Sequence, residues 1–231
     1  MNNPASSLPK LAIFDMDGIL FNTEELFMNK KAYYLKQFGY PARKEDYVRT
    51  LGACGNTLNQ ILFDIYGADY PANEISDLTR ESVRNHINKF GLEIKDGIPE
   101  LLKYLTEHKI LCMVASSTTT STVEHYLHIS ELAKYFSEVI GGDMVTNSKP
   151  DPEIFLKAFN LHKRYIPSIS LQEAVVFEDS ENGILAAHAA GIPSICIPDL
   201  KIPEDNIKSL TSAIFNSAHD VILYYDTMKG M

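Results

Sequence analysis

The sequence has few cysteines and no long hydrophobic run. Cys54, Cys112 and Cys196 lie far apart among 231 residues, and no two of them form a CxxC pair. An odd, sparse set of this kind favours free thiols in a reducing compartment. The first apolar run, Leu11–Phe14, is too short for the core of a signal peptide. No run approaches the roughly 18 apolar residues of a membrane span. We therefore expect a cytoplasmic protein that does not enter a membrane.

Basic residues are in the minority. The chain has 21 Lys and Arg against 30 Asp and Glu, which gives a net charge of −9. This balance disfavours binding to nucleic acid or to an anionic membrane surface, because both need a basic patch. It does not exclude a small anionic substrate, because a bound metal ion can reverse the local field. The expected oligomeric state is a monomer or a weak homodimer.

Short apolar runs, each ending in polar residues or in Gly and Pro, recur along the chain. Because these runs are continuous and do not alternate with polar residues, they are typical of parallel strands buried on both faces. Helical patterns fill most of the intervals, so the sequence predicts an α/β fold with a doubly wound parallel sheet. The five runs are Leu11–Phe14, Ile110–Ala115, Val139–Ile140, Ala174–Phe177 and Ser194–Ile197.

One interval is too long to be an ordinary crossover. About 95 residues separate Asp15 from Ile110, whereas such connections usually take far fewer. Helical patterns over Glu24–Phe38, Thr57–Tyr66 and Ile75–Phe90 occupy it. We therefore expect an inserted helical domain at residues 24–95, with the core formed by residues 1–23 and 96–231.

Polar side chains follow the predicted strands, and in doubly wound sheets ligands bind outside the carboxyl ends of the strands. Four carboxylates would meet there with hydroxyls and one ammonium group. Like charges this close need compensation, and a hard cation with oxygen ligands, such as Mg²⁺, supplies it. A metal, a lysine and a hydroxyl together suit a phosphoryl group. The residues are Asp15, Asp17, Ser116, Ser117, Lys149, Glu178 and Asp179.

Two carboxylates at this spacing can divide the chemistry of phosphoryl transfer. An aspartate beside a phosphoryl group can attack phosphorus and form an aspartyl-phosphate. A second carboxylate two residues further along can protonate the leaving alcohol and later activate water. Asp15 and Asp17 have this spacing.

Four motifs in order resemble those of the haloacid dehalogenase-like hydrolases. The first begins at Phe14-Asp15-Met16-Asp17-Gly18, and the second is Val114-Ala115-Ser116. The third is Lys149-Pro150-Asp151-Pro152, and the fourth runs from Phe177 to Gly183. The helical insertion resembles the cap of the β-phosphoglucomutase-like branch. The resemblance covers residues 11–198 and implies a haloacid dehalogenase-like core with an inserted α-helical cap.

The resemblance also implies roles for individual residues. Asp15 is the expected nucleophile and Asp17 the general acid and base, while Ser116 and Lys149 hold the phosphoryl oxygens. Mg²⁺ is expected on Asp15, Asp179 and the Asp17 carbonyl, with Glu178 on the metal directly or through water. Ser117 of the core, with Gly52 and Asn56 of the cap loop, completes the expected substrate-binding set.

The leading interpretation is a Mg²⁺-dependent phosphatase of small phosphorylated metabolites, with sugar phosphates as the expected class. A β-phosphoglucomutase-like mutase is the first alternative. A phospho-receiver module also gathers Asp, Ser or Thr, and Lys at strand ends, but it lacks an inserted helical domain. Hydrolysis of phosphonates in this family uses a cap lysine, which the loop from Thr50 to Thr57 does not contain.

Each of these residues also has an ordinary structural interpretation. Asp and Ser after apolar runs are common helix N-caps and turn formers. Lys149 could be a solvated surface residue, and Glu178 could serve only to orient its neighbours. Cys54 has no adjacent base that would activate it, so we interpret it as a packing residue.

Overall fold

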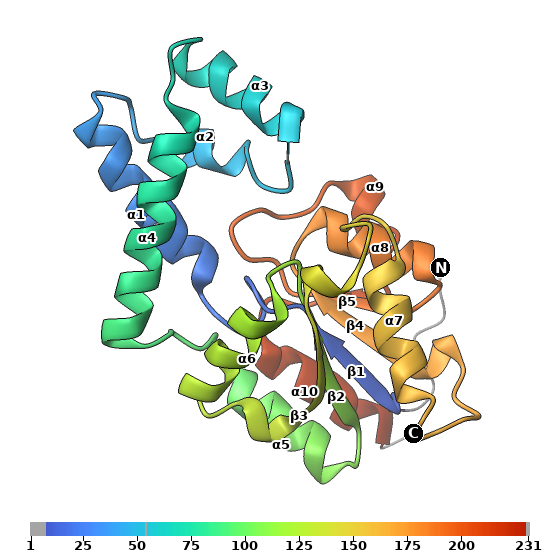
Figure 1. Ribbon diagram of the computed structural model, residues 1–231. Helices are drawn as coiled ribbons and strands as arrows, with labels where there is room; N and C mark the ends of the chain where they lie inside the picture. Colours follow the sequence, from blue (N-terminus) through green and yellow to red (C-terminus); the bar gives the residue numbers. More distant parts are fainter. Residues whose placement is uncertain (1–7, 54, 230–231) are drawn as a thin grey trace. The chain divides into compact units, whose positions relative to one another are not determined.

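The computed structural model describes residues 8–53 and 55–229, which divide into two compact units (Figure 1). The sheet unit contains the described residues through Phe21 and those from Ile94 onward, and the helical unit is Asn22–Glu93. The expected boundaries, after residues 23 and 95, lie two residues further along the chain than these.

The sheet unit is built on six parallel strands in the order β3-β2-β1-β4-β5-β6. Central β1 pairs on one side with β2 and on the other with β4, and all four of its residues are buried. The predicted doubly wound α/β sheet is thus confirmed. The strands are β1 (Leu11–Phe14), β2 (Leu111–Ala115), β3 (Phe136–Ile140), β4 (Ala174–Glu178), β5 (Ser194–Cys196) and β6 (Ala213–Ile214).

Helices cover both faces of the sheet (Figure 1). On one face, apolar side chains of α7 and α8 pack on Leu11 and Ile13 of β1. On the other, α5 and α10 lie together, and the Tyr104 hydroxyl donates to Asp226 at 2.9 Å. The helices of the sheet unit, with short 3₁₀ turns labelled η, are α5 (Ile98–Glu107), α6 (Thr120–Ile129), η1 (Ala133–Tyr135), η2 (Gly142–Met144), α7 (Glu153–His162), η3 (Leu171–Glu173), α8 (Glu181–Ala190), α9 (Asp205–Lys208) and α10 (Ala218–Lys229).

The helical unit has a small hydrophobic core of its own. Its helices are α1 (Thr23–Gln37), α2 (Lys44–Val48), α3 (Gly55–Tyr66) and α4 (Ala72–Phe90). Leu35, Leu62, Tyr70 and Ile75 form the buried cluster between them. The ring of Tyr70 stacks on that of Tyr66 at 4.7 Å between centroids, and such aromatic pairs add to the free energy of burial.

Two elements differ from the sequence prediction. The sheet has a sixth strand, β6, where five apolar runs predict five strands, and the short helix α2 lies in a segment with no predicted element. Both are brief, so periodicity gives them little signal. Cys112 and Cys196 are buried free thiols, and Cys54 lies outside the described residues.

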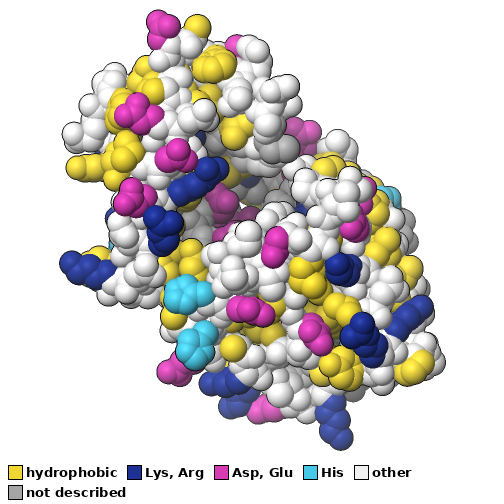
Figure 2. Space-filling view, in the orientation of Figure 1, with side chains coloured by type: hydrophobic (Ala, Val, Ile, Leu, Met, Phe, Trp, Pro, Cys, Tyr) yellow, Lys and Arg dark blue, Asp and Glu magenta, His cyan; other side chains and the backbone are white. Residues whose placement is uncertain are grey.

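The surface carries charges of both signs. On the face seen in Figure 2, the Lys and Arg side chains are scattered among acidic and apolar ones and form no single basic patch. None of the helices within the described part of the chain has the length and apolar character that crossing a membrane would require.

Candidate active site

The strand order of the sheet reverses between β1 and β4, and ligands bind at such a point in open parallel sheets. Asp15 follows β1 directly, and Glu178 is the last residue of β4. The backbone N–H of Asp15 donates to the carbonyl oxygen of Phe177 at 2.9 Å. The strand pairing therefore holds these two carboxylates side by side at the carboxyl edge of the sheet.

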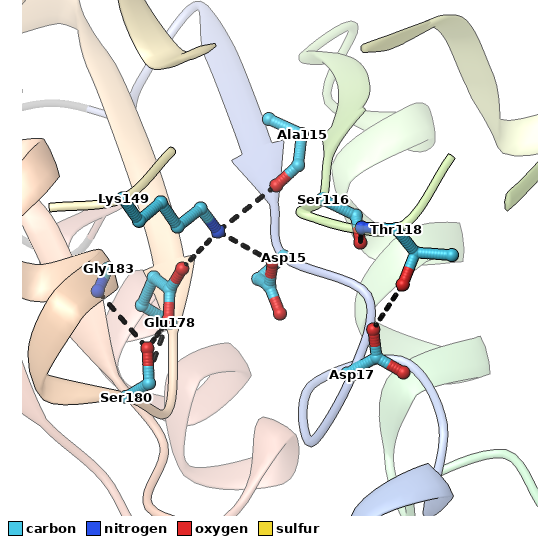
Figure 3. A network of polar contacts seen from close by, with 9 residues as sticks. All are labelled: Asp15, Asp17, Ala115, Ser116, Thr118, Lys149, Glu178, Ser180 and Gly183. Carbon is cyan, nitrogen blue, oxygen red and sulfur yellow. Dashed lines mark hydrogen bonds and ion pairs between the residues drawn. The ribbon is translucent and has the colours of Figure 1, made fainter. Parts of the chain in front are cut away.

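Lys149 joins three strand ends through its ammonium group (Figure 3). Its Nζ donates to Asp15 Oδ1 at 2.6 Å, to Glu178 Oε1 at 2.5 Å and to the carbonyl oxygen of Ala115 at 3.2 Å. The Lys149 side chain is only 7% exposed, which excludes its interpretation as a solvated surface residue. Hydrogen bonds between charged groups are shorter and stronger than neutral ones, so this ammonium fixes both carboxylates.

A side chain of the following helix, α7, fixes the loop that precedes Lys149. The Glu153 carboxylate, in the first turn of α7, accepts hydrogen bonds from the backbone N–H groups of Thr146 and Asn147, each at 2.9 Å. These bonds hold the pKa of Glu153 below its ordinary value. Glu153 thus keeps the loop in the conformation that places Lys149 at the strand ends.

Both oxygens of Glu178 accept hydrogen bonds from the protein. Oε1 accepts from Lys149, and Oε2 accepts from the backbone N–H and hydroxyl of Ser180 at 3.2 and 3.0 Å. Ser180 is also the N-cap of α8, since its Oγ accepts from the backbone N–H of Gly183 at 3.1 Å. A Cβ at Gly183 would overlap the Glu178 carboxylate. Glycine is therefore required where α8 approaches the site.

Asp179 brings a third carboxylate to the same place. Asp15, Glu178 and Asp179 each offer one oxygen, and these three atoms lie within 4.8 Å of one another. Gly18 approaches from the loop after β1 with a φ of 77°, and a Cβ there would overlap the Asp179 carboxylate. Such an oxygen cluster suits a hard divalent cation.

The charges in this cluster do not balance, because one ammonium group faces several carboxylates. Burial raises the pKa of Asp15 to about 8; Glu178 and Asp17 add to the rise, and Lys149 opposes it. Burial alone would lower the pKa of Lys149, but the carboxylates of Asp15 and Glu178 raise it above its ordinary value. Lys149 therefore stays charged, and Asp15 needs further positive charge nearby to ionise at neutral pH.

A second group of polar residues follows β2. Ser116 is fully buried, and its Oγ accepts from the backbone N–H of Thr118 at 3.1 Å. The hydroxyl of Thr118 in turn donates to Asp17 Oδ2 at 3.1 Å (Figure 3). Asp17 is half-buried in the loop after β1. The structure thus links the loops after β1 and β2.

Several residues that hold this arrangement were not predicted from the sequence. Thr118 stands in a run of Ser and Thr that looks like any polar loop. Glu153 looks like an ordinary first-turn acid, and only Ser180, three residues before Gly183, has a recognisable N-cap signal. Among the predicted binding residues, Ser117 is exposed in the sheet unit, and Gly52 and Asn56 are exposed in the helical unit.

The chain is similar in sequence and in fold to several known proteins. Residues 12–197 match the family described as haloacid dehalogenase-like hydrolase. The chain is 33% identical over 189 residues to the phosphorylated carbohydrates phosphatase of Thermotoga maritima, covering 79% of this chain and 82% of that one. It is 31% identical over 178 residues to a pyrophosphatase of Listeria monocytogenes, with coverage of 77% and 78%. The solved structure of a β-phosphoglucomutase candidate from Thermotoga maritima is 25% identical, with a TM-score of 0.72 over 94% of this chain and 99% of that one.

The raised pKa of Asp15 predicts how stability depends on pH in the metal-free protein. Between the unfolded pKa of about 4 and the folded value of about 8, the folded state binds more protons than the unfolded one. The free energy of unfolding should therefore fall with rising pH, by up to about 1.4 kcal/mol per pH unit from this group. Asp15→Asn removes the proton-binding group and should flatten the dependence.

The measurement is urea unfolding in excess chelator at several pH values between about 5 and 7. Asp143→Asn is the matched control: hydrogen bonds from Thr120 lower the pKa of Asp143, so it titrates below this range. Wild type should lose stability relative to Asp15→Asn as the pH rises, and the difference between wild type and Asp143→Asn should stay constant. Equal slopes for wild type and Asp15→Asn would contradict the assignment.

Proposed function

We propose that this chain, which belongs to the haloacid dehalogenase-like hydrolase family, is a phosphatase of small phosphorylated metabolites, with sugar phosphates as the main class. The observation that carries the proposal is the buried contact of Lys149 with Asp15 and Glu178 at the point where the strand order reverses. The relative from Thermotoga maritima, a phosphatase of phosphorylated carbohydrates, supports the substrate class.

In the first step, a carboxylate oxygen of Asp15 attacks phosphorus. Lys149 holds Oδ1, and the second oxygen points away from Lys149 (Figure 3), so we assign the attack to Oδ2. The phosphorus–oxygen bond to the leaving group breaks, and its electron pair goes to the leaving oxygen, which takes a proton from Asp17. The Lys149 ammonium and the Ser116 hydroxyl stabilise the charge on the phosphoryl oxygens. The product on the enzyme is an aspartyl-phosphate.

In the second step, water attacks the phosphorus of the aspartyl-phosphate and gives a proton to Asp17. The bond between phosphorus and the Asp15 oxygen breaks, which releases inorganic phosphate and restores the Asp15 carboxylate. Asp17 regains in this step the proton that it gave up in the first. One carboxyl group thus serves in turn as acid and as base, as general catalysis of both steps requires.

Mg²⁺ is the proposed cofactor, held by Asp15, Asp179 and the backbone carbonyl of Asp17. When bound, a divalent cation neutralises charge on the phosphoryl oxygens. The three clustered carboxylate oxygens fit such an ion. Both oxygens of Glu178 already accept hydrogen bonds from the protein, which favours contact with the ion through water over direct ligation.

We assign the helical unit, residues 22–93, the role of a cap that excludes water and recognises the leaving group. Gly52 and Asn56 are the residues that we expect to contact substrate from it, and Ser117 from the sheet unit. These assignments stay predictions, as does the cytoplasmic location.

A mutase that moves a phosphoryl group within a sugar is the second candidate, and residues of the helical unit disfavour it. Phe27 stands where the mutase pattern has a histidine, and its ring lies 6.5 Å from that of Tyr47 within the helical unit. The stretch from Gly52 to Asn56 has no basic residue, and Arg49 lies upstream of it. A mutase must bind both phosphates of a bisphosphate, so it needs cationic groups at both ends.

The direct test is a phosphate-release assay on sugar phosphates, polyol phosphates and nucleotides. Release should require Mg²⁺ and stop in excess chelator, and Ca²⁺ should inhibit because its larger, looser coordination misplaces the phosphoryl group. Full activity of protein shown to be free of metal would refute the metal assignment. No release from any ester would refute the phosphatase.

Asp15→Asn should abolish turnover and leave the fold intact, because an amide cannot act as the anionic nucleophile. The expected loss in kcat is more than about 10³-fold. Asp77→Asn, at an exposed acid of the helical unit paired with Arg80, is the matched control and should turn over like wild type. Near-normal turnover by Asp15→Asn would contradict the assignment of Asp15 as the nucleophile.

Hexose 1-phosphates separate the two candidate functions. The protein should release inorganic phosphate from them at a rate that a hexose bisphosphate does not stimulate. Both inorganic phosphate and hexose 6-phosphate are followed in the same reaction. Rapid, bisphosphate-dependent formation of the 6-phosphate with negligible phosphate release would instead identify a mutase.

A further inference from the structure

Thr118 occupies a fixed position between Ser116 and Asp17. Its backbone N–H donates to Ser116 Oγ at 3.1 Å, and its carbonyl oxygen accepts from the backbone N–H of Gly142 at 2.9 Å. Its hydroxyl donates to Asp17 Oδ2 at 3.1 Å (Figure 3). Two backbone contacts therefore place this hydroxyl before it meets the carboxylate, so the contact is preorganised.

We propose that Thr118 is a positioning residue that orients the carboxyl group of Asp17 toward the leaving oxygen, through the hydrogen bond from its hydroxyl to Oδ2. The hydroxyl donates to one oxygen of the carboxyl group and so restrains the rotation of that group. The hydrogen bond from Thr118 persists when Asp17 is ionised, because a carboxylate oxygen also accepts hydrogen bonds. This inference rests on the proposed function, in which Asp17 is the acid and the base.

Neighbouring hydroxyls have other partners. Thr119 Oγ1 lies 2.9 Å from Thr122 Oγ1, and Thr120 Oγ1 donates to Asp143 at 2.8 Å. Thr119 is the N-cap of α6 and Thr120 its first residue, while Asp143 lies in η2. Within this run of threonines, the contact with Asp17 is thus assigned to Thr118, and Thr119 provides a matched control in the same loop.

Without the hydroxyl, the carboxyl group of Asp17 would lose a restraint on its orientation. Rotation about the terminal bond of an aspartate side chain is soft and nearly two-fold, so the carboxyl group could turn out of the orientation that proton transfer needs. Small errors in the placement of a catalytic group cost up to about 10²-fold in rate. We expect Thr118→Val, which keeps the side-chain shape, to lower kcat for a hexose 6-phosphate about 10-fold, and to leave KM within about two-fold.

The experiment compares Thr118→Val, Thr118→Ser and Thr119→Val in the full chain with Mg²⁺. Thr118→Ser retains the hydroxyl and should restore kcat to within about three-fold of wild type, and Thr119→Val should match wild type. The first-turnover burst of p-nitrophenolate from p-nitrophenyl phosphate should be unchanged in Thr118→Val, because that leaving group needs no proton. A merely structural defect would slow this burst as well.

A double-mutant cycle with Asp17→Asn completes the test. Thr118→Val should add no further loss of hexose 6-phosphate turnover in that background, because Thr118 acts through Asp17. A full additional loss there, a slowed p-nitrophenolate burst, failure of the serine to rescue, or wild-type kcat in Thr118→Val would each overturn the proposal. Absence of phosphate release by wild-type protein would instead refute the proposed function.

Discussion

The site depends on one buried cation, the ammonium group of Lys149. It lies 2.6 Å from Asp15 and 2.5 Å from Glu178, carboxylates that end the two strands between which the sheet order reverses. Without it, two buried carboxyl groups would face each other across neighbouring strands with no ammonium group between them. Breaking a buried ion pair of this kind typically costs about 3–5 kcal/mol in stability. Lys149 thus serves the packing of the strand ends as well as the proposed chemistry.

The acidic groups of the site differ in the contacts that hold them. Glu178 is satisfied by Lys149 and Ser180, so its two oxygens are fixed before any ligand arrives. Asp15 is left with a pKa of about 8 in its buried position, and it gains from any further cation placed beside it. Asp17, in the loop after β1, accepts a hydrogen bond from the neutral hydroxyl of Thr118. Lys149 thus contacts both Asp15 and Glu178, whereas Thr118 contacts both Ser116 and Asp17.

Much of this arrangement could be predicted from the sequence, because four motifs end or follow continuous apolar strands. Asp15, Ser116, Lys149 and Glu178 lie at the carboxyl edge for that reason. Thr118 could not be predicted, since its role depends on the distance between two loops that are about 100 residues apart in the sequence. The two-residue strand β6 could not be predicted either, because it is too short to show an apolar pattern. It joins the edge of the sheet by pairing with β5.

In the proposed mechanism, Asp15 carries the phosphoryl group during turnover. The most direct measurement is to stop the reaction with a sugar phosphate in acid within the first turnover. Borohydride then reduces any acyl phosphate, and peptides are mapped by mass spectrometry. We expect homoserine in place of Asp15 in wild-type protein, and unmodified Asp17. Homoserine at another position, or phosphate release with no reducible acyl phosphate at any time point, would contradict it.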